Sequence, residues 1–156
     1  MQLQTFDDYR DALKLAIQRE EDAMVFYEKM ADKAHHAEQK SLLKRLAIEE
    51  KGHKKILADF APEVTNPPRG SFTPPEYSFE DLEEKDLTTE KIFQLAIRKE
   101  EESLNFYARF LVYFFKTGHE EVFKKIFEVE LKHKEELERN FKDFVKKEGK
   151  KTVEVQ

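Results

Sequence analysis

Apolar side chains recur every three or four positions in four long segments of this chain, which is the spacing of one buried face on an α-helix. These segments contain no proline and are rich in alanine, leucine, glutamate and lysine. The pattern predicts an all-α protein. We expect helices from Thr5 to about His35, from about Glu38 to Phe60, from Thr88 to about Lys116, and from about His119 to Lys147.

The breaks between these segments predict how the helices are connected. A short turn within each pair makes the two helices antiparallel neighbours. Thr5 and Thr88 are candidate N-caps, with Thr88 near Lys91, and Gly118 is a candidate C-terminal cap. The connection from 61 to 88 holds all five prolines and is long enough to run the length of the bundle.

These connections predict one domain over residues 1–156, a four-helix bundle with a single long Pro-rich crossover. Three aromatic residues of the crossover, Phe72, Tyr77 and Phe79, would pin it to the bundle, and a short helix is possible from Phe79 to Lys85. The expected parts are hairpin 1 at about 5–60, the crossover linker at 61–88, hairpin 2 at about 88–147 and a charged, frayed tail at 148–156.

The two hairpins match each other at a shift of 80 residues without a gap. Leu15-Ala16-Ile17 aligns with Leu95-Ala96-Ile97, and Phe26-Tyr27 with Phe106-Tyr107. The same shift places Glu50 and His53 on Glu130 and His133. This correspondence predicts an internal duplication of a helical hairpin.

Each predicted helix carries one glutamate in the middle of its apolar stripe. Glu20 and Glu50 are each fifteen residues from position 35, and Glu100 and Glu130 are each fifteen from position 115. At 1.5 Å per residue, each lies about 22 Å from its turn. We therefore expect the four carboxylates to meet at one level of the bundle.

Two histidines, His53 and His133, follow Glu50 and Glu130 by three residues and share their helix faces. Alone, each of these acids and histidines has an ordinary structural explanation, such as pairing with lysine or packing in the core. Together, four buried carboxylates need positive charge. Two divalent cations balance them with both imidazoles neutral, so the pattern predicts a dinuclear metal site.

These motifs resemble those of the rubrerythrin-like branch of the ferritin-like superfamily. The resemblance rests on Arg19-Glu20-Glu21 with Phe26-Tyr27, Glu50-Lys51-Gly52-His53, Lys99-Glu100-Glu101 with Phe106-Tyr107, and Glu130-Leu131-Lys132-His133. It implies a ferritin-like four-helix bundle in which Glu20 with His53 and Glu100 with His133 are terminal ligands, while Glu50 and Glu130 bridge the metals. Tyr27 and Tyr107 lie two turns beyond their glutamates and could donate to ligand carboxylates, although plain core packing explains them equally well.

Two departures from the family pattern bear on activity. Peroxide-reducing rubrerythrins carry an extra glutamate three residues after the third-helix ligand, where this chain has Ser103, and Ala23 stands at the matching place in the first helix. The cysteine-ligated electron-transfer domain is also missing, since the chain has no cysteine. Electrons would then come from a separate donor protein.

Three functions remain open on these residues. The first is a di-iron oxidoreductase that reacts with oxygen or peroxide. The second is an iron-binding protein of the ferroxidase type, which oxidises Fe(II) without multi-turnover catalysis. The third is a helical interaction module with a vestigial site. The oxygen and nitrogen ligands suit iron or manganese, and zinc would also bind.

Composition limits the partners. With 28 lysines and arginines against 33 acids, the net charge of −5 argues against nucleic acid. The start has no signal-peptide pattern and the longest apolar run, from Phe110 to Phe115, is far too short for a membrane span, so we expect a cytoplasmic protein. The longer segment from Asn105 to Phe115 is apolar on more than one helical face and favours a homodimer. His35, His36 and His119 are expected to be solvated turn residues; the alternative is a surface metal site.

Overall fold

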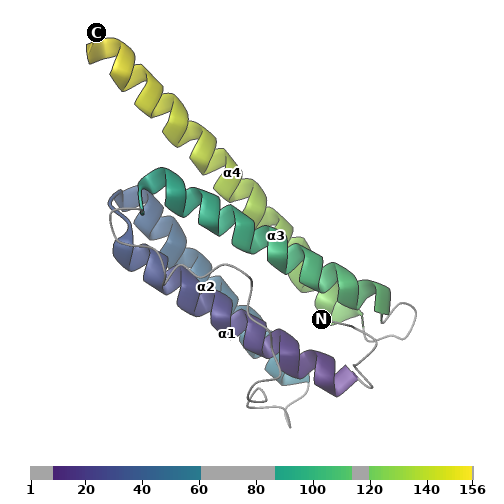
Figure 1. The fold of residues 1–156 in the computed structure, drawn as a ribbon. Helices are drawn as coiled ribbons and strands as arrows, with labels where there is room; N and C mark the ends of the chain where they lie inside the picture. The colour runs from purple at the N-terminus through teal and green to yellow at the C-terminus, as the bar shows by residue number, and fades with distance from the viewer. Residues whose placement is uncertain (1–8, 61–86, 114–119, 156) are drawn as a thin grey trace.

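The computed structural model describes residues 9–60, 87–113 and 120–155. Within these ranges the chain forms four helices: α1 (Tyr9–Lys33), α2 (Ala37–Phe60), α3 (Thr89–Tyr113) and α4 (Glu121–Val155). Their long axes lie side by side as a bundle (Figure 1). The all-α four-helix architecture expected from the apolar periodicity is confirmed.

Contacts between the helices show which helices are neighbours and in which direction they run. α1 packs mainly against α2 and α3 mainly against α4, and smaller contacts join α1 to α3 and α2 to α4. The side-chain amide of Gln39, at the start of α2, donates to the backbone carbonyl of Thr89, at the start of α3 (2.9 Å). These two helices therefore begin at the same end of the bundle (Figure 1). The last residue of α2 lies at the opposite end of the bundle from the first residue of α3.

Two of the predicted helix boundaries can be compared with the structure. The hydroxyl of Thr88 accepts the backbone N–H of Lys91 at 3.0 Å, so the N-cap expected at Thr88 is present. The turn between α1 and α2 is centred on residue 35, the point from which the heights of Glu20 and Glu50 were counted. The proposed caps at Thr5 and Gly118, the crossover aromatics and the short helix at 79–85 all lie outside the described residues.

The end of α4 differs from the expectation. The helix was predicted to stop at about Lys147 and to leave a frayed tail, but it continues to Val155 and extends beyond the other three helices (Figure 1). The residues after Lys147 lack a proline and include several good helix formers, and the helix continues through Gly149. The predicted helix end at about Lys147 was therefore wrong, while the fraying of the tail stays a prediction.

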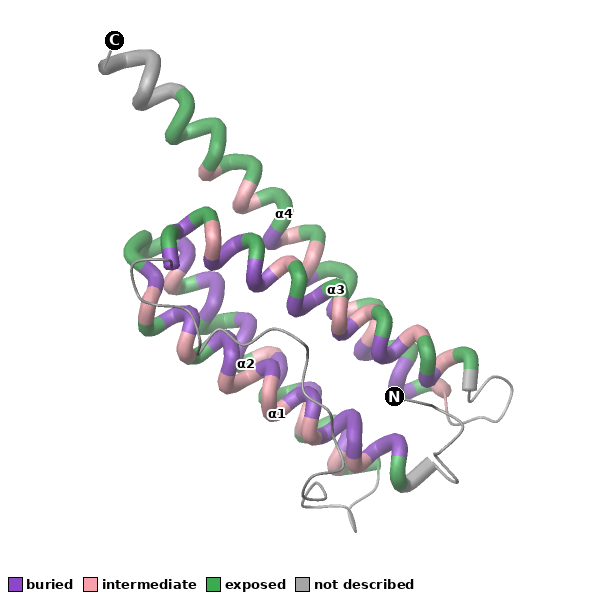
Figure 2. The backbone as a smooth tube through the Cα atoms, in the orientation of Figure 1, coloured by how far each residue is buried: buried purple, intermediate pink, exposed green. Residues whose placement is uncertain are grey.

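The buried faces of the helices turn toward one another (Figure 2). They form two apolar clusters at different levels of the bundle. One is built around Leu57, Phe110 and Phe123, and the other around Met30 and Leu46. Buried polar side chains occupy the level between the clusters, which places the candidate site at mid-height in the core.

None of the helices in the described ranges has a stretch that is long and apolar enough to cross a membrane.

Candidate metal centre

All six predicted ligands lie in the core, and none is more than 6% exposed. Each helix carries one of the carboxylates because each has a glutamate on its inward stripe. α2 and α4 add an imidazole one turn further along, since a spacing of three residues keeps a side chain on the same face. The structure brings together the whole predicted set: Glu20, Glu50, His53, Glu100, Glu130 and His133.

The six side chains form two groups, each able to surround one ion. The first contains Glu20, Glu50, His53 and Glu130, and the second contains Glu50, Glu100, Glu130 and His133. Within each group one ligand atom from every residue lies within 4.8 Å of the others. Glu50 and Glu130 belong to both groups, while the other four residues belong to one each. The shared pair and the four unshared residues are the same residues for which the family resemblance implies bridging and terminal roles.

Both imidazoles turn the same ring nitrogen toward the carboxylates. Nδ1 of His53 lies 3.3 Å from Glu130 and 3.6 Å from Glu20. Nδ1 of His133 lies 3.2 Å from Glu50 and 3.6 Å from Glu100. The two rings stack with centroids 5.9 Å apart and an angle of 16° between their planes. Each ring thus presents one donor nitrogen to its own group.

Tyrosine hydroxyls hold Glu20 and Glu100, the two glutamates predicted to be terminal ligands. Tyr27 on α1 donates to Glu100 on α3. Tyr107 on α3 donates to Glu20 on α1 at 2.5 Å. Both tyrosines are fully buried, so these hydrogen bonds fix the carboxylates where water cannot reach them. The proposed contact of the tyrosines with ligand carboxylates is present, and each crosses to the other hairpin.

Electrostatics of the metal-free cluster show how strongly it attracts positive charge. Burial, then repulsion from Glu130, raises the pKa of Glu50 and the pKa of Glu100 well above the ordinary value. Burial opposes charge on His53, but contacts with Glu130 and Glu20 outweigh it and raise its pKa to about 12. The pKa of His133 is likewise raised, against burial, by Glu100 and Glu130. In the absence of metal, protons on Glu50, Glu100 and the two imidazoles therefore offset negative charge in the cluster.

Several buried carboxylate oxygens of the described residues have no hydrogen-bond donor. They include Oε2 of Glu20, both oxygens of Glu50, Oε2 of Glu100 and Oε1 of Glu130. An unsatisfied buried oxygen is costly, and a divalent cation satisfies several at once. Carboxylate and imidazole ligands match iron, manganese or zinc. The donor set therefore fits a pair of divalent cations.

One residue near the centre was not predicted from the sequence. Oε2 of Glu49 lies 2.5 Å from Nε2 of His133, on the side of the ring away from the cluster. The two atoms are in contact, but the geometry of the contact does not meet the criteria for a hydrogen bond. At a shift of 80 the counterpart of Glu49 is Val129. This difference between the two repeats was the sequence feature that could have identified Glu49.

Two buried cations lie beside the centre, one residue before Glu20 and Glu100. The guanidinium of Arg19 sits over the ring of Phe106 at 5.1 Å. Burial, then repulsion from Arg19, lowers the pKa of Lys99 to about 8. Ser103 is buried nearby on α3, so the position of the extra glutamate of peroxide-reducing rubrerythrins holds a small hydroxyl side chain here.

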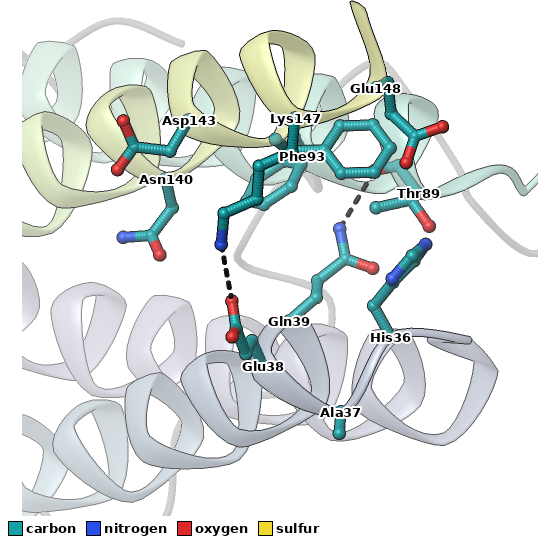
Figure 3. A pocket seen from close by; sticks show the side chains of 11 residues that line it. His36, Ala37, Glu38, Gln39, Thr89, Phe93, Asn140, Asp143, Lys147 and Glu148 are labelled. Carbon is teal, nitrogen blue, oxygen red and sulfur yellow. Dashed lines mark hydrogen bonds and ion pairs between the residues drawn. The ribbon is translucent and has the colours of Figure 1, made fainter. Parts of the chain in front are cut away.

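The predicted turn histidines lie away from the centre. His35 and His36 are exposed at the turn between α1 and α2, and His119 is outside the described residues. His36 contacts the edge of Phe144 and lines a cavity of about 360 Å³ between the start of α2 and the far part of α4 (Figure 3). This cavity shares no residue with the six predicted ligands.

The apolar run on α3 divides between core and surface. Phe110 is fully buried, whereas Val112 is 78% exposed, and the residues from 114 to 119 lie outside the described ranges. The homodimer expected from this run stays a prediction.

Comparison with known proteins agrees with this geometry. The family model described as Rubrerythrin matches residues 11–141. No curated protein matches the chain. A solved structure of a hypothetical protein from Pyrococcus furiosus is similar, with 22% identity and a TM-score of 0.67, over 90% of this chain and 92% of that one. At this identity the similarity to the solved structure concerns the fold.

Proposed function

The chain belongs to the rubrerythrin family, and on that premise we propose that it is a di-iron carboxylate protein that reacts with oxygen or peroxide and takes electrons from a separate donor protein. The observation that carries this proposal is the pair of ligand groups that share Glu50 and Glu130. An iron pair, when bound, supplies the electrons that reduce an oxidant.

The protein's own residues would do four things in that reaction. Glu20 with His53, and Glu100 with His133, would each hold one metal at its outer side. Glu50 and Glu130 would keep the two metals close to each other. Tyr27 and Tyr107 would hold the terminal carboxylates by hydrogen bonds from Tyr27 to Glu100 and from Tyr107 to Glu20. The two apolar clusters above and below would keep bulk water away.

The first experiment tests the site itself. Wild-type protein purified with iron should contain two metal ions per chain by elemental analysis, and chelation should lower the melting temperature, because bound metal stabilises the folded state. The Glu130→Ala variant removes a ligand from both groups and should lose metal from both. Glu128→Ala is a matched control, since Glu128 is an exposed acid on the same helix.

A vestigial site gives a different result. If Glu130→Ala leaves metal content and melting temperature unchanged, the chain is a helical interaction module, and both metal functions are wrong.

A second candidate function is Fe(II) oxidation without sustained turnover. Ser103, buried three residues after Glu100, offers no carboxylate at the place of the extra glutamate, and the sequence contains no cysteine that could hold an electron-transfer iron. Oxygen uptake after addition of Fe(II) separates the two candidates. Uptake that stops after one equivalent per iron pair, even with a chemical reductant present, favours iron handling. Continued uptake of oxygen or peroxide with the reductant favours the oxidoreductase.

A further inference from the structure

Glu49 breaks the near-equivalence of the two halves of the centre. The tyrosine contacts obey the shift of 80, since Tyr27 with Glu100 corresponds to Tyr107 with Glu20. The contact of Glu49 with His133 has no such counterpart, because Val129 stands where an acid would face His53. A valine can neither accept a proton nor bring a negative charge.

Glu49 is itself held in place on α2. Its Oε1 contacts Arg45 at 3.3 Å, and Arg45 also pairs with Glu136 on α4. Its Oε2, which faces His133, is buried even though the side chain as a whole is 38% exposed. The carboxylate is therefore anchored on one oxygen and presented to the imidazole with the other.

The residues that anchor Glu49 also lack counterparts in the other half. At a shift of 80, Lys125 corresponds to Arg45, and Ile56 corresponds to Glu136. Ile56 is 43% exposed and carries no charge that could pair with Lys125. On the His133 side, contacts of Arg45, Glu49 and Glu136 link α2 to α4. The corresponding residues on the His53 side are Lys125, Val129 and Ile56, and none of these three is a carboxylate.

From this difference we infer that Glu49 is a positioning residue that makes the two metal positions inequivalent, with the position of Glu100 and His133 binding its cation more tightly. The inference rests on the proposed dinuclear site. Glu49 holds Nδ1 of His133 toward the cluster by contacting Nε2, and it adds a negative charge beside that position. A carboxylate behind a metal-binding imidazole contributes roughly 10- to 100-fold in metal affinity.

Stepwise binding of Co²⁺ to the metal-free full-length chain tests the inference, followed by calorimetry and by visible absorption of the bound ion. Wild-type protein should bind two equivalents in two steps. His133→Ala should abolish the tighter step and His53→Ala the weaker one, which assigns each step to a position. Glu49→Val should weaken the tighter step roughly 10- to 100-fold and leave the other nearly unchanged.

The sequence offers matched variants. Val129→Glu should strengthen the weaker step, and the double variant Glu49→Val with Val129→Glu should make the His53 position the tighter one. Glu128→Val, at an exposed site on α4, controls for a change in net charge. Glu49→Gln keeps the size of the side chain and serves if Glu49→Val fails to fold, as judged by circular dichroism. It should weaken the tighter step in the same direction.

The outcomes separate this inference from the proposed function. If wild-type protein binds two ions and Glu49→Val and Glu49→Gln weaken both steps equally or neither step, the role of Glu49 is wrong and the dinuclear site stands. If wild-type protein binds no Co²⁺, the dinuclear site is wrong and the role of Glu49 falls with it.

Discussion

Tyr27 on α1 donates its hydroxyl hydrogen to Glu100 on α3, so a residue of the first hairpin fixes a predicted metal ligand of the second. Tyr107 and Glu20 make the reciprocal bond in the opposite direction. Each hairpin therefore holds a predicted terminal ligand of the other. Neither hairpin alone could build its half of the centre with its carboxylate in this position.

Replacing either tyrosine by phenylalanine should destabilise the metal-free protein. The ring would stay in the core, but a buried carboxylate would lose its donor, which costs about 1–3 kcal/mol. Tyr27→Phe and Tyr107→Phe should lower the melting temperature by similar amounts because the two bonds are equivalent. Thermal unfolding by circular dichroism measures this effect. An unchanged melting temperature in both variants would show that the hydroxyls contribute only packing.

Metal binding should release protons and strengthen as pH rises. The pKa of His53 is raised to about 12, and those of Glu50 and Glu100 are raised by burial, so at neutral pH the metal-free groups hold protons that the cation must displace. The apparent affinity should rise about tenfold per pH unit for each proton released. Calorimetry in buffers with different ionisation enthalpies counts these protons. Affinity that is constant between pH 6 and 8 would contradict this account.

Lys99→Met should stabilise the protein at pH 7. Burial lowers the pKa of Lys99 from 10.5 to about 8, so folding disfavours its charged form. That penalty is fully present below pH 8 and disappears as pH rises toward 10.5, and it is on the order of 1–3 kcal/mol at pH 7. Urea unfolding at pH 7 and pH 10 should show a gain that shrinks at the higher pH. The control is Lys132→Met at an exposed position, which should change little.

Phe110→Ala should be strongly destabilising. Its side chain is fully buried and its ring lies 4.9 Å from that of Phe123 on α4, so truncation leaves a cavity between α3 and α4. The expected loss is about 3–5 kcal/mol in the free energy of unfolding. Val112→Ala, two residues away, should change it by no more than about 0.5 kcal/mol. A large loss at Val112 would indicate that a partner, such as a second copy of the chain, covers this face.

Local patterns predicted the helices and the level of the four acids well. An apolar stripe and its glutamate are fixed by helical periodicity, and equal distance from a turn fixes height in an antiparallel pair. Glu20 and Glu50 could therefore be placed together without coordinates. The end of α4 was misjudged because a charged, polar segment such as the one after Lys147 is compatible with both a frayed tail and a continued helix.

The sequence by itself determined which residues face the core, because the period of an α-helix links position along the chain to direction around the axis. The tertiary structure decided which partners those residues meet. The rotation of α4 against α2 brings Glu49 to the outer nitrogen of His133, and the packing of α1 against α3 pairs each tyrosine with the other hairpin's glutamate and buries Arg19 and Lys99. These relations depend on how helices are turned against one another, and periodicity along a single helix does not contain that angle.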